Sequence, residues 1–305
     1  MSSIIVQEKI GSGSYGTVYK ALLVGYGEIT LKELTGNVKK ILTELVVDVR
    51  IGELKLAHSK CAKRIFIDPT QMSVAKAVFG EHDVSNYVRV ATNLTIEKQA
   101  SVFVMYDLVN GITLDKYVNE MLATSVFPPM NVIHQNALDM MYAVQELHAS
   151  GIAHCDVKPE NMMLEKGNVI LIDFGMACFA NKCKGLKGSP LYTSPEMYLA
   201  GVNKEWENVN WLKFDVFAVG MSIFFLFFGE TVYNLMFENL ENVYQLLMFS
   251  RLSMSVQRER IEAVLTSDDV EEKYRPFFRG MLNVNVGRRF TIEEGIRVFR
   301  AIEGK

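Results

Sequence analysis

The alternation of hydrophobic and polar residues predicts strands at the start of the chain. Residues 4–10, 17–24 and 28–34 are rich in β-branched and aromatic side chains and are separated by glycine-containing turns, which is typical of short antiparallel strands. Gly25-Tyr26-Gly27 is typical of a hairpin connection between the second and the third. Similar strand-like runs follow later, at residues 74–79, 88–91 and 102–108.

Helical spacing first appears over residues 37–56. Residues at steps of three and four, Ile41, Leu45, Asp48 or Val49, and Gly52, predict one helix there. Beyond Gly111 helical patterns dominate. Residues 131–150 place Ile133, Ala137, Val144 and Leu147 on one face, and most segments after Asp215 are helical.

One strongly apolar run, residues 216–228, is shorter than the ~20 residues that span a bilayer. Asp215 and Glu230 flank it closely, so we predict a buried core helix rather than a membrane anchor. A strand-rich part followed by a helix-rich part predicts an α+β fold with two lobes. The junction near residue 108 is where a ligand cleft is expected.

Composition excludes several classes of protein. The 305 residues are 49% apolar and 22% charged, as in ordinary globular chains and unlike disordered or collagen-like ones. The net charge, 32 basic minus 35 acidic residues or −3, offers no basic excess for nucleic acid. We therefore expect no nucleic-acid partner, and an anionic ligand needs local positive charge.

The four cysteines are too few for a disulfide scaffold. We predict free thiols in a reducing compartment at Cys61, Cys155, Cys178 and Cys183. The first residues show no basic region followed by a long apolar stretch, so no signal peptide is expected.

A glycine-rich segment lies between the first two predicted strands. It comprises Gly11, Ser12, Gly13, Ser14, Tyr15 and Gly16, with Val18 just beyond. Glycines let backbone amides approach phosphate oxygens, although a plain glycine turn explains the pattern equally well. A strand rather than a helix follows, and no Gly-Lys-Ser/Thr ends the segment. Dinucleotide-binding and P-loop folds are therefore disfavoured.

Lys32 follows the run Ile29-Thr30-Leu31 on the third predicted strand, 16 residues after Gly16, where it is placed to reach phosphates bound by the glycine-rich segment. Such a lysine needs a carboxylate to hold it in position. Glu44 is preferred because the apolar positions of its predicted helix put it beside the buried face, and Glu53 stays open as the alternative.

The motif-rich middle of the chain carries a family resemblance. Residues 154–161 read His-Cys-Asp-Val-Lys-Pro-Glu-Asn, and residues 173–175 read Asp-Phe-Gly. In order and spacing these motifs closely resemble eukaryotic-type protein kinases, which have His-Arg-Asp where this chain has His-Cys-Asp. The resemblance covers about residues 4–300 and implies one bilobal kinase domain over residues 1–305. The β-rich N-lobe with one main helix spans residues 1–108, and the mostly helical C-lobe spans residues 109–305.

The chemistry of phosphoryl transfer suits these residues, because the reaction needs positioning and charge neutralisation. Asp156 is placed to orient a substrate hydroxyl and accept its proton, and Lys158 to neutralise the moving phosphoryl group. Asn161 and Asp173 offer oxygen ligands of the kind that Mg²⁺ prefers.

The resemblance also implies structural roles. His154 packs beneath the Asp-Phe-Gly segment, and Asp215 caps backbone amides of the catalytic loop. Glu196 pairs with a late arginine, for which Arg289 is a better candidate than Arg288.

The hinge between the lobes is expected within residues 105–109, where backbone groups bind adenine. If Gly111 aligns with the family's glycine beyond the hinge, Tyr106 is the gatekeeper, and Asp107 and Val109 make the contacts. A shift of one residue makes Met105 the gatekeeper instead.

Two features favour serine/threonine substrates by this resemblance. Lys158 stands two residues after the aspartate, where serine/threonine kinases have lysine. Ser189, in a segment similar to the family's Gly-Thr-Pro-x-Tyr-x-Ala-Pro-Glu, replaces the threonine that hydrogen-bonds the catalytic loop.

Cys155 departs from the family pattern because it replaces the arginine that binds a phosphorylated activation segment. No Ser, Thr or Tyr lies between Phe174 and Gly188. We therefore predict activity that does not depend on phosphorylation of this segment. Lys182, Lys184 and Lys187 either favour acidic substrates or form a solvated basic loop.

The function predicted is a serine/threonine protein kinase that uses ATP and Mg²⁺ on protein substrates. A pseudokinase that binds nucleotide or partners without catalysis is the alternative, and a small-molecule kinase is disfavoured by the segment around residues 188–196. We expect a monomer without a membrane partner. The expected location is intracellular, cytoplasmic or nuclear, or within a host cell if so minimal a kinase is viral.

Overall fold

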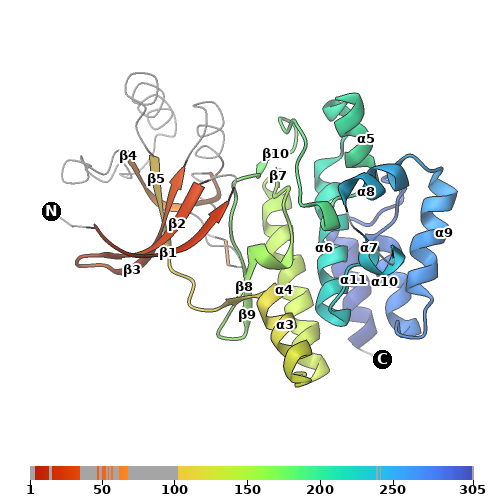
Figure 1. Cartoon of the computed structure of the whole chain (residues 1–305), viewed down its shortest axis with the longest axis horizontal. Helices are drawn as coiled ribbons and strands as arrows, with labels where there is room; N and C mark the ends of the chain where they lie inside the picture. Colours follow the sequence, from red (N-terminus) through yellow and green to blue (C-terminus); the bar gives the residue numbers. More distant parts are fainter. Residues whose placement is uncertain are drawn as a thin grey trace. The chain divides into compact units, whose positions relative to one another are not determined.

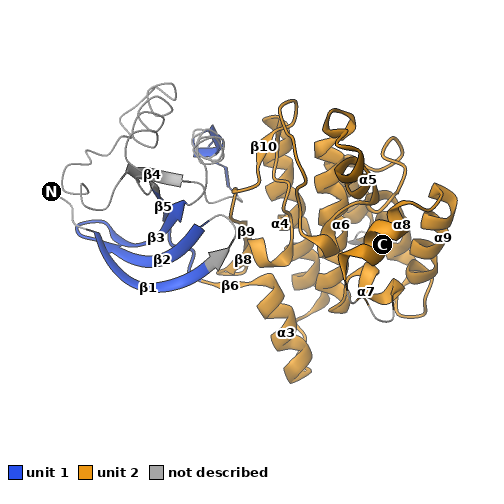
Figure 2. Cartoon of the chain, turned by 45° about the horizontal axis from the view of Figure 1, so that its top comes forward, with its two compact units in different colours: residues 1–110 blue, residues 111–305 orange. Residues whose placement is uncertain are grey.

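The computed structural model describes most of the chain. The described residues are 4–13, 16–34, 47, 50–52, 54, 56–57, 62–67, 102–237, 240 and 242–303. They fall into two compact units, residues 1–110 and residues 111–305 (Figure 2).

Unit 1 is built on a five-stranded antiparallel sheet with the order β1-β2-β3-β5-β4 (Figure 1). The strands are β1 (Ile4–Gly13), β2 (Gly16–Leu23), β3 (Gly27–Leu34), β4 (Ala62–Ile67) and β5 (Val102–Asp107). Four of them confirm strands predicted from the alternating pattern. β4 was not predicted, and the predicted strands at residues 74–79 and 88–91 lie outside the described residues.

The predicted helix at residues 37–56 is confirmed in part. Of the residues that the structure describes there, 47, 50–52 and 54 are helical, whereas residue 56 is not. Val47 and Ile51, four positions apart, are buried, and neither belongs to the apolar face predicted for this helix. That face was inferred largely from residues that the structure does not describe.

Unit 2 is mostly helical, with two small sheets. Its strands are β6 (Ile112–Thr113), β7 (Ile152–Ala153), β8 (Met162–Glu165), β9 (Asn168–Leu171) and β10 (Cys178–Phe179). Its helices are α3 (Leu114–Thr124), α4 (Met130–Ala149), α5 (Pro195–Asn203), α6 (Trp211–Phe228), α7 (Val232–Met236), α8 (Val243–Ser250), α9 (Met254–Leu265), α10 (Arg275–Met281) and α11 (Ile292–Glu303). Four 3₁₀ turns, η2 to η5, lie among the described residues, and η2 (Pro159–Asn161) and η3 (Pro190–Tyr192) belong to the site described below. An antiparallel sheet followed by a mostly helical remainder confirms the predicted α+β class.

α6 forms the centre of unit 2, where it packs against α4, α10 and α7 (Figure 1). Asn210 caps its start by accepting a hydrogen bond from the Lys213 amide, and Gly229 ends it in the left-handed region, with φ 73°. By length and composition α6 is apolar enough to cross a membrane, but 72% of it is buried inside the unit. The prediction of a buried core helix is confirmed, and this burial explains why α6 is apolar on all sides.

Candidate active site

The loop after β7 is held by one buried carboxylate. Asp215 of α6 accepts hydrogen bonds from the amide of His154 at 2.7 Å and from the amide of Cys155 at 2.8 Å. Cys155 has φ 63°, a left-handed conformation that is costly for a residue with a Cβ. The two hydrogen bonds offset this cost and confirm the capping role that the resemblance implied for Asp215.

His148 adds a third contact to the same carboxylate. Its Nε2 lies 3.0 Å from Asp215 Oδ2, near the end of α4. No sequence signal pointed to this histidine, because only the packing of α4 on α6 brings the two residues together.

Asp156 is the centre of a hydrogen-bond network. Ser189 Oγ donates to Asp156 Oδ1 at 2.8 Å, and Lys158 Nζ lies 3.0 Å from Asp156 Oδ2. Lys158 Nζ also donates to Ser189 Oγ at 2.7 Å, so the three side chains close a ring of polar contacts. Asn161 Nδ2 donates to the carbonyl and to Oδ2 of Asp156. The contact predicted between Ser189 and the catalytic loop is confirmed.

The Asp-Phe-Gly segment lies beside this loop in unit 2. The Phe174 ring is buried and meets the His154 ring edge to face at 5.3 Å. His154 Nε2 lies 3.2 Å from the carbonyl of Ile172. The predicted packing of His154 beneath the segment is confirmed. Asp173 has φ 57° and an exposed side chain, a conformation that aspartate adopts more readily than bulkier residues.

The residues predicted to hold Mg²⁺ fit a hard cation by their donor atoms. The Asn161 side chain donates two hydrogen bonds to Asp156 from Nδ2, so the atom that it offers to a cation is Oδ1. Asp173 supplies an exposed carboxylate. An amide oxygen and a carboxylate are ligands that Mg²⁺ accepts, with water and phosphate oxygens completing the shell.

An ion pair ties the segment around residue 196 to the end of the chain. Arg289 Nη1 and Nη2 donate to the two carboxylate oxygens of Glu196 at 2.6 and 2.9 Å. Arg289 also donates to the carbonyls of Asn283 and Lys213 and lies over the Phe217 ring. The choice of Arg289 over Arg288 is confirmed.

In unit 1 the pairing of the strands shows which side chains share a face of the sheet. Lys32 pairs directly with Val18 on β2 and with Val104 on β5, and Thr30 pairs with Tyr106. Directly paired residues share a face, and residues two apart along a strand share it too. Val18, Lys32 and Tyr106 therefore lie on one face of the sheet.

Met105 lies on the opposite face. It pairs with Leu31, and both belong to a buried apolar cluster. Asp107, at the end of β5, accepts a 2.8 Å hydrogen bond from the Tyr26 hydroxyl, and Val109 is buried.

The glycine-rich segment joins β1 to β2. Gly13 pairs with Gly16, and Gly16 has φ 139°. A Cβ at Gly16 would lie 1.8 Å from the Glu33 carbonyl oxygen, so only glycine fits there. Gly11 and the backbone of Ser12 lie in β1. Ser14 and Tyr15 lie outside the described residues, as do Glu44 and Glu53.

The cysteines correct one prediction. Cys178 and Cys183 form a disulfide, whereas all four cysteines were expected to be free thiols. Their spacing of five is not a familiar motif, and the turn after β10 brings them together. Cys155 is a free, buried thiol, and Cys61 lies outside the described residues.

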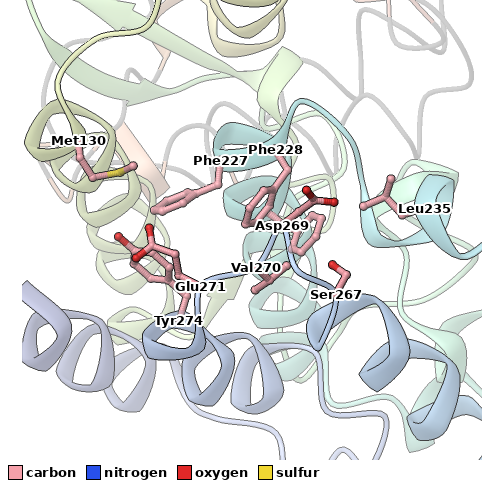
Figure 3. A pocket seen from close by; sticks show the side chains of 10 residues that line it. Met130, Phe227, Phe228, Leu235, Ser267, Asp269, Val270, Glu271 and Tyr274 are labelled. Atoms are coloured by element: carbon pink, nitrogen blue, oxygen red, sulfur yellow. The ribbon is translucent and has the colours of Figure 1, made fainter.

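A separate pocket of about 430 Å³ lies in unit 2 (Figure 3). Aromatic side chains from the end of α6 and from Tyr274 line it, together with Asp269 and Glu271. Glu271 is paired with Lys273 at 2.8 Å. None of the catalytic-loop residues lines this pocket.

Comparison with known proteins identifies the class that this fold and site define. Residues 4–298 match the protein kinase domain family. The chain belongs to that family.

The curated relatives are distant and longer. The chain is 25% identical to dual specificity protein kinase shkB of Dictyostelium discoideum, over 76% of this chain and 31% of that protein. It is 24% identical to serine/threonine-protein kinase ULK3 of Xenopus laevis, over 75% and 43%. It is also 25% identical to ovarian-specific serine/threonine-protein kinase Lok of Drosophila melanogaster, over 72% and 42%. The alignments thus span less than half the length of each of these relatives.

Proposed function

We propose that this chain is an active serine/threonine protein kinase that transfers the γ-phosphoryl group of ATP to protein hydroxyls. The observation that carries the proposal is the ring of contacts among Asp156, Lys158 and Ser189. A carboxylate held by a serine hydroxyl and an ammonium group is oriented to accept a hydroxyl proton. The ammonium group supplies positive charge for the phosphoryl group in transfer.

Nucleotide binding is assigned to the face of the unit 1 sheet that carries Lys32. The glycine-rich segment supplies backbone amides and Lys32 a positive charge for the phosphates, with Val18 as an apolar neighbour. Tyr106 shares this face by strand register, which favours Tyr106 over Met105 as gatekeeper. With Tyr106 as gatekeeper, the backbone groups of Asp107 and Val109 are the ones that hydrogen-bond adenine.

Magnesium would be held by Asn161 and Asp173. When bound, it supplies charge neutralisation at the phosphate oxygens. Asp156 contributes to this site by fixing the Asn161 amide through two hydrogen bonds, which sets the direction of its oxygen.

The serine/threonine preference rests on Lys158 and Ser189, which bind each other and Asp156. Two of the three relatives named above are serine/threonine kinases and one is a dual specificity kinase. A panel of peptides differing only in Ser, Thr or Tyr as acceptor tests the preference. Equal transfer to the tyrosine peptide would contradict it.

Independence from activation-segment phosphorylation is part of the proposal. It rests on Cys155 in the place of arginine and on the absence of Ser, Thr and Tyr between Phe174 and Gly188. Mass mapping of the active enzyme and phosphatase treatment test it. Loss of activity on removal of a phosphate from this segment would contradict it.

The decisive experiment is a transfer assay with labelled ATP, Mg²⁺ and generic protein substrates. Asp156→Asn should abolish transfer, while the matched control Asp268→Asn, at an exposed position, should retain it. Transfer by the wild type no greater than by Asp156→Asn would support the pseudokinase alternative. The intracellular location and the monomeric state stay predictions from the sequence.

A further inference from the structure

Three cysteine sulfurs gather where the activation segment meets the catalytic loop. The sulfurs of Cys155, Cys178 and Cys183 all lie within 4.8 Å of one another, and all three residues are buried. β10 lies beside β7 (Figure 1). In this pairing Cys178 of β10 lies opposite Ala153, two residues before Cys155. The cluster therefore joins two segments that are 23 residues apart.

The contact between the thiol and the disulfide is direct. Cys155 Sγ lies 3.5 Å from Cys178 Sγ, which is close to van der Waals contact between sulfurs. Cys178 is bonded to Cys183. Cys178 is thus the shared neighbour of two sulfurs, one that is bonded to it and one that touches it.

The position of the Cys155 backbone is held independently of the sulfurs. Asp215 binds its amide at 2.8 Å, and the buried cluster includes Met197, Trp211 and Phe214. These contacts keep the thiol against the disulfide rather than directed toward solvent. Solvent-borne thiols have little access to the buried pair, whereas Cys155 is already beside it.

We propose that Cys155, Cys178 and Cys183 form an internal thiol–disulfide exchange site in which Cys178 is bonded alternately to Cys183 or to Cys155. In the first state the activation segment is closed on itself by a short loop. In the second it is tied covalently to the catalytic loop, one residue before Asp156. The second bond joins the two segments that the family's arginine and phosphorylated residue would join.

The exchange needs no external oxidant or reductant. Cys155 loses its proton, and its thiolate attacks Cys178 Sγ. The Cys155–Cys178 bond forms as the Cys178–Cys183 bond breaks, and the electron pair leaves on Cys183 Sγ, which takes up a proton. One disulfide and one thiol are present before and after the step.

Disulfide mapping of the full chain tests the proposal without reference to kinase activity. Protein prepared without reductant is quenched in acid, its free thiols are blocked with N-ethylmaleimide under denaturing conditions, and it is digested with trypsin. Cleavage after Lys166, Lys182 and Lys184 separates the three cysteines. Peptide 167–182, which carries Cys178, is then linked either to dipeptide 183–184 or to peptide 117–166.

We expect the 167–182/183–184 species in the wild type, accompanied by the 167–182/117–166 species. In oxidised glutathione, Cys183→Ser should convert at least half of Cys178 to the Cys155-linked form, and Cys155→Ser should give only the Cys183-linked form. Cys61→Ser serves as a matched control and should leave both species unchanged. Thermal unfolding of each variant identifies any that fails to fold.

Three results would overturn the proposal. One is a Cys183→Ser protein in which Cys178 carries glutathione while Cys155 is recovered as its maleimide adduct. Another is wild-type protein with no Cys155-linked peptide after prolonged incubation at alkaline pH. The third is a native mass that contains a metal ion held by the three reduced cysteines, since these ligands also suit zinc.

Discussion

The Ser189 hydroxyl donates a 2.8 Å hydrogen bond to Asp156 Oδ1 and accepts one of 2.7 Å from Lys158 Nζ. One small side chain, on the residue directly before η3, thereby contacts both proposed catalytic groups. The threonine of the family's motif can make the same two contacts, because only the hydroxyl is required.

Ser189→Ala should lower kcat by roughly 10- to 100-fold, because Asp156 and Lys158 lose the group that orients them. KM for ATP should change less than kcat, since Ser189 binds no nucleotide group in the proposed mechanism. Steady-state kinetics measure both, and Ser189→Thr should restore most of kcat. Ser255→Ala, at an exposed position, is the matched control. An unaltered kcat in Ser189→Ala would contradict the orienting role.

Asp215→Asn should destabilise the protein by about 2 kcal/mol, because an amide side chain cannot accept from all the donors around it. The His154 and Cys155 amides both need an acceptor in this buried place, and a buried donor left without one is costly. Urea unfolding measures the change. Asp268→Asn should stay within about 0.5 kcal/mol of wild type, and equal effects of the two variants would contradict the assignment.

Arg289→Lys should cost about 3 kcal/mol of unfolding free energy, because lysine cannot keep the two-pronged contact with Glu196 or the two carbonyl contacts. The exposed pair of Arg279 and Glu262 offers a control of the same chemistry. Arg279→Lys should cost less than about 1 kcal/mol. Similar losses of unfolding free energy in Arg289→Lys and Arg279→Lys would contradict the prediction that burial makes the Arg289–Glu196 pair the stronger one.

Tyr106→Ala should increase the use of an ATP analogue enlarged at the adenine amino group by at least roughly tenfold relative to ATP, because it removes a large ring from the Lys32 face. Met105→Ala should instead lower stability by about 2 to 4 kcal/mol through loss of core packing on the opposite face. Competition assays with the two nucleotides measure the first effect. Increased use of the enlarged analogue by Met105→Ala, but not by Tyr106→Ala, would instead identify Met105 as the gatekeeper.

Thiol–disulfide exchange at Cys155 should accelerate about tenfold for each unit of pH between roughly pH 7 and pH 8. Burial raises the pKa of this thiol well above its usual value, and the neighbouring carboxylates of Asp215 and Asp156 add to the rise, while Lys187 opposes it. The reactive thiolate is therefore a small fraction that grows with pH. The rate at which the 167–182/117–166 peptide appears measures this, and a rate independent of pH would contradict attack by Cys155.

The motifs and four of the strands could be predicted because they depend on local chemistry. Alternating β-branched residues specify β1, β2, β3 and β5, and the spacing of apolar residues specifies α4. The carboxylate and amide types at Asp156, Asn161 and Asp173 indicate phosphoryl chemistry through their order along the chain, since that order resembles a known family.

The run Ile65-Phe66-Ile67 is a local strand signal that β4 carries, but only its pairing with β5 gives β4 its place in the sheet. The identity of the gatekeeper, Met105 or Tyr106, also depends on strand pairing. A shift of one residue moves a side chain to the other face of a sheet, and only the pairing of Lys32 with Val104 and of Thr30 with Tyr106 decides which face each residue takes.

Residue type and spacing are enough to indicate the kinase family, the order of the catalytic motifs and the succession of strands and helices. Which distant groups meet follows from the fold. The Asp215 carboxylate lies beneath two amides and His148, and Arg289 reaches Glu196 across 93 positions. Cys178 bonds to Cys183 and touches Cys155 because β10 pairs with β7. These contacts join residues from different helices, strands and loops, so they form only when the backbone folds and brings those elements together.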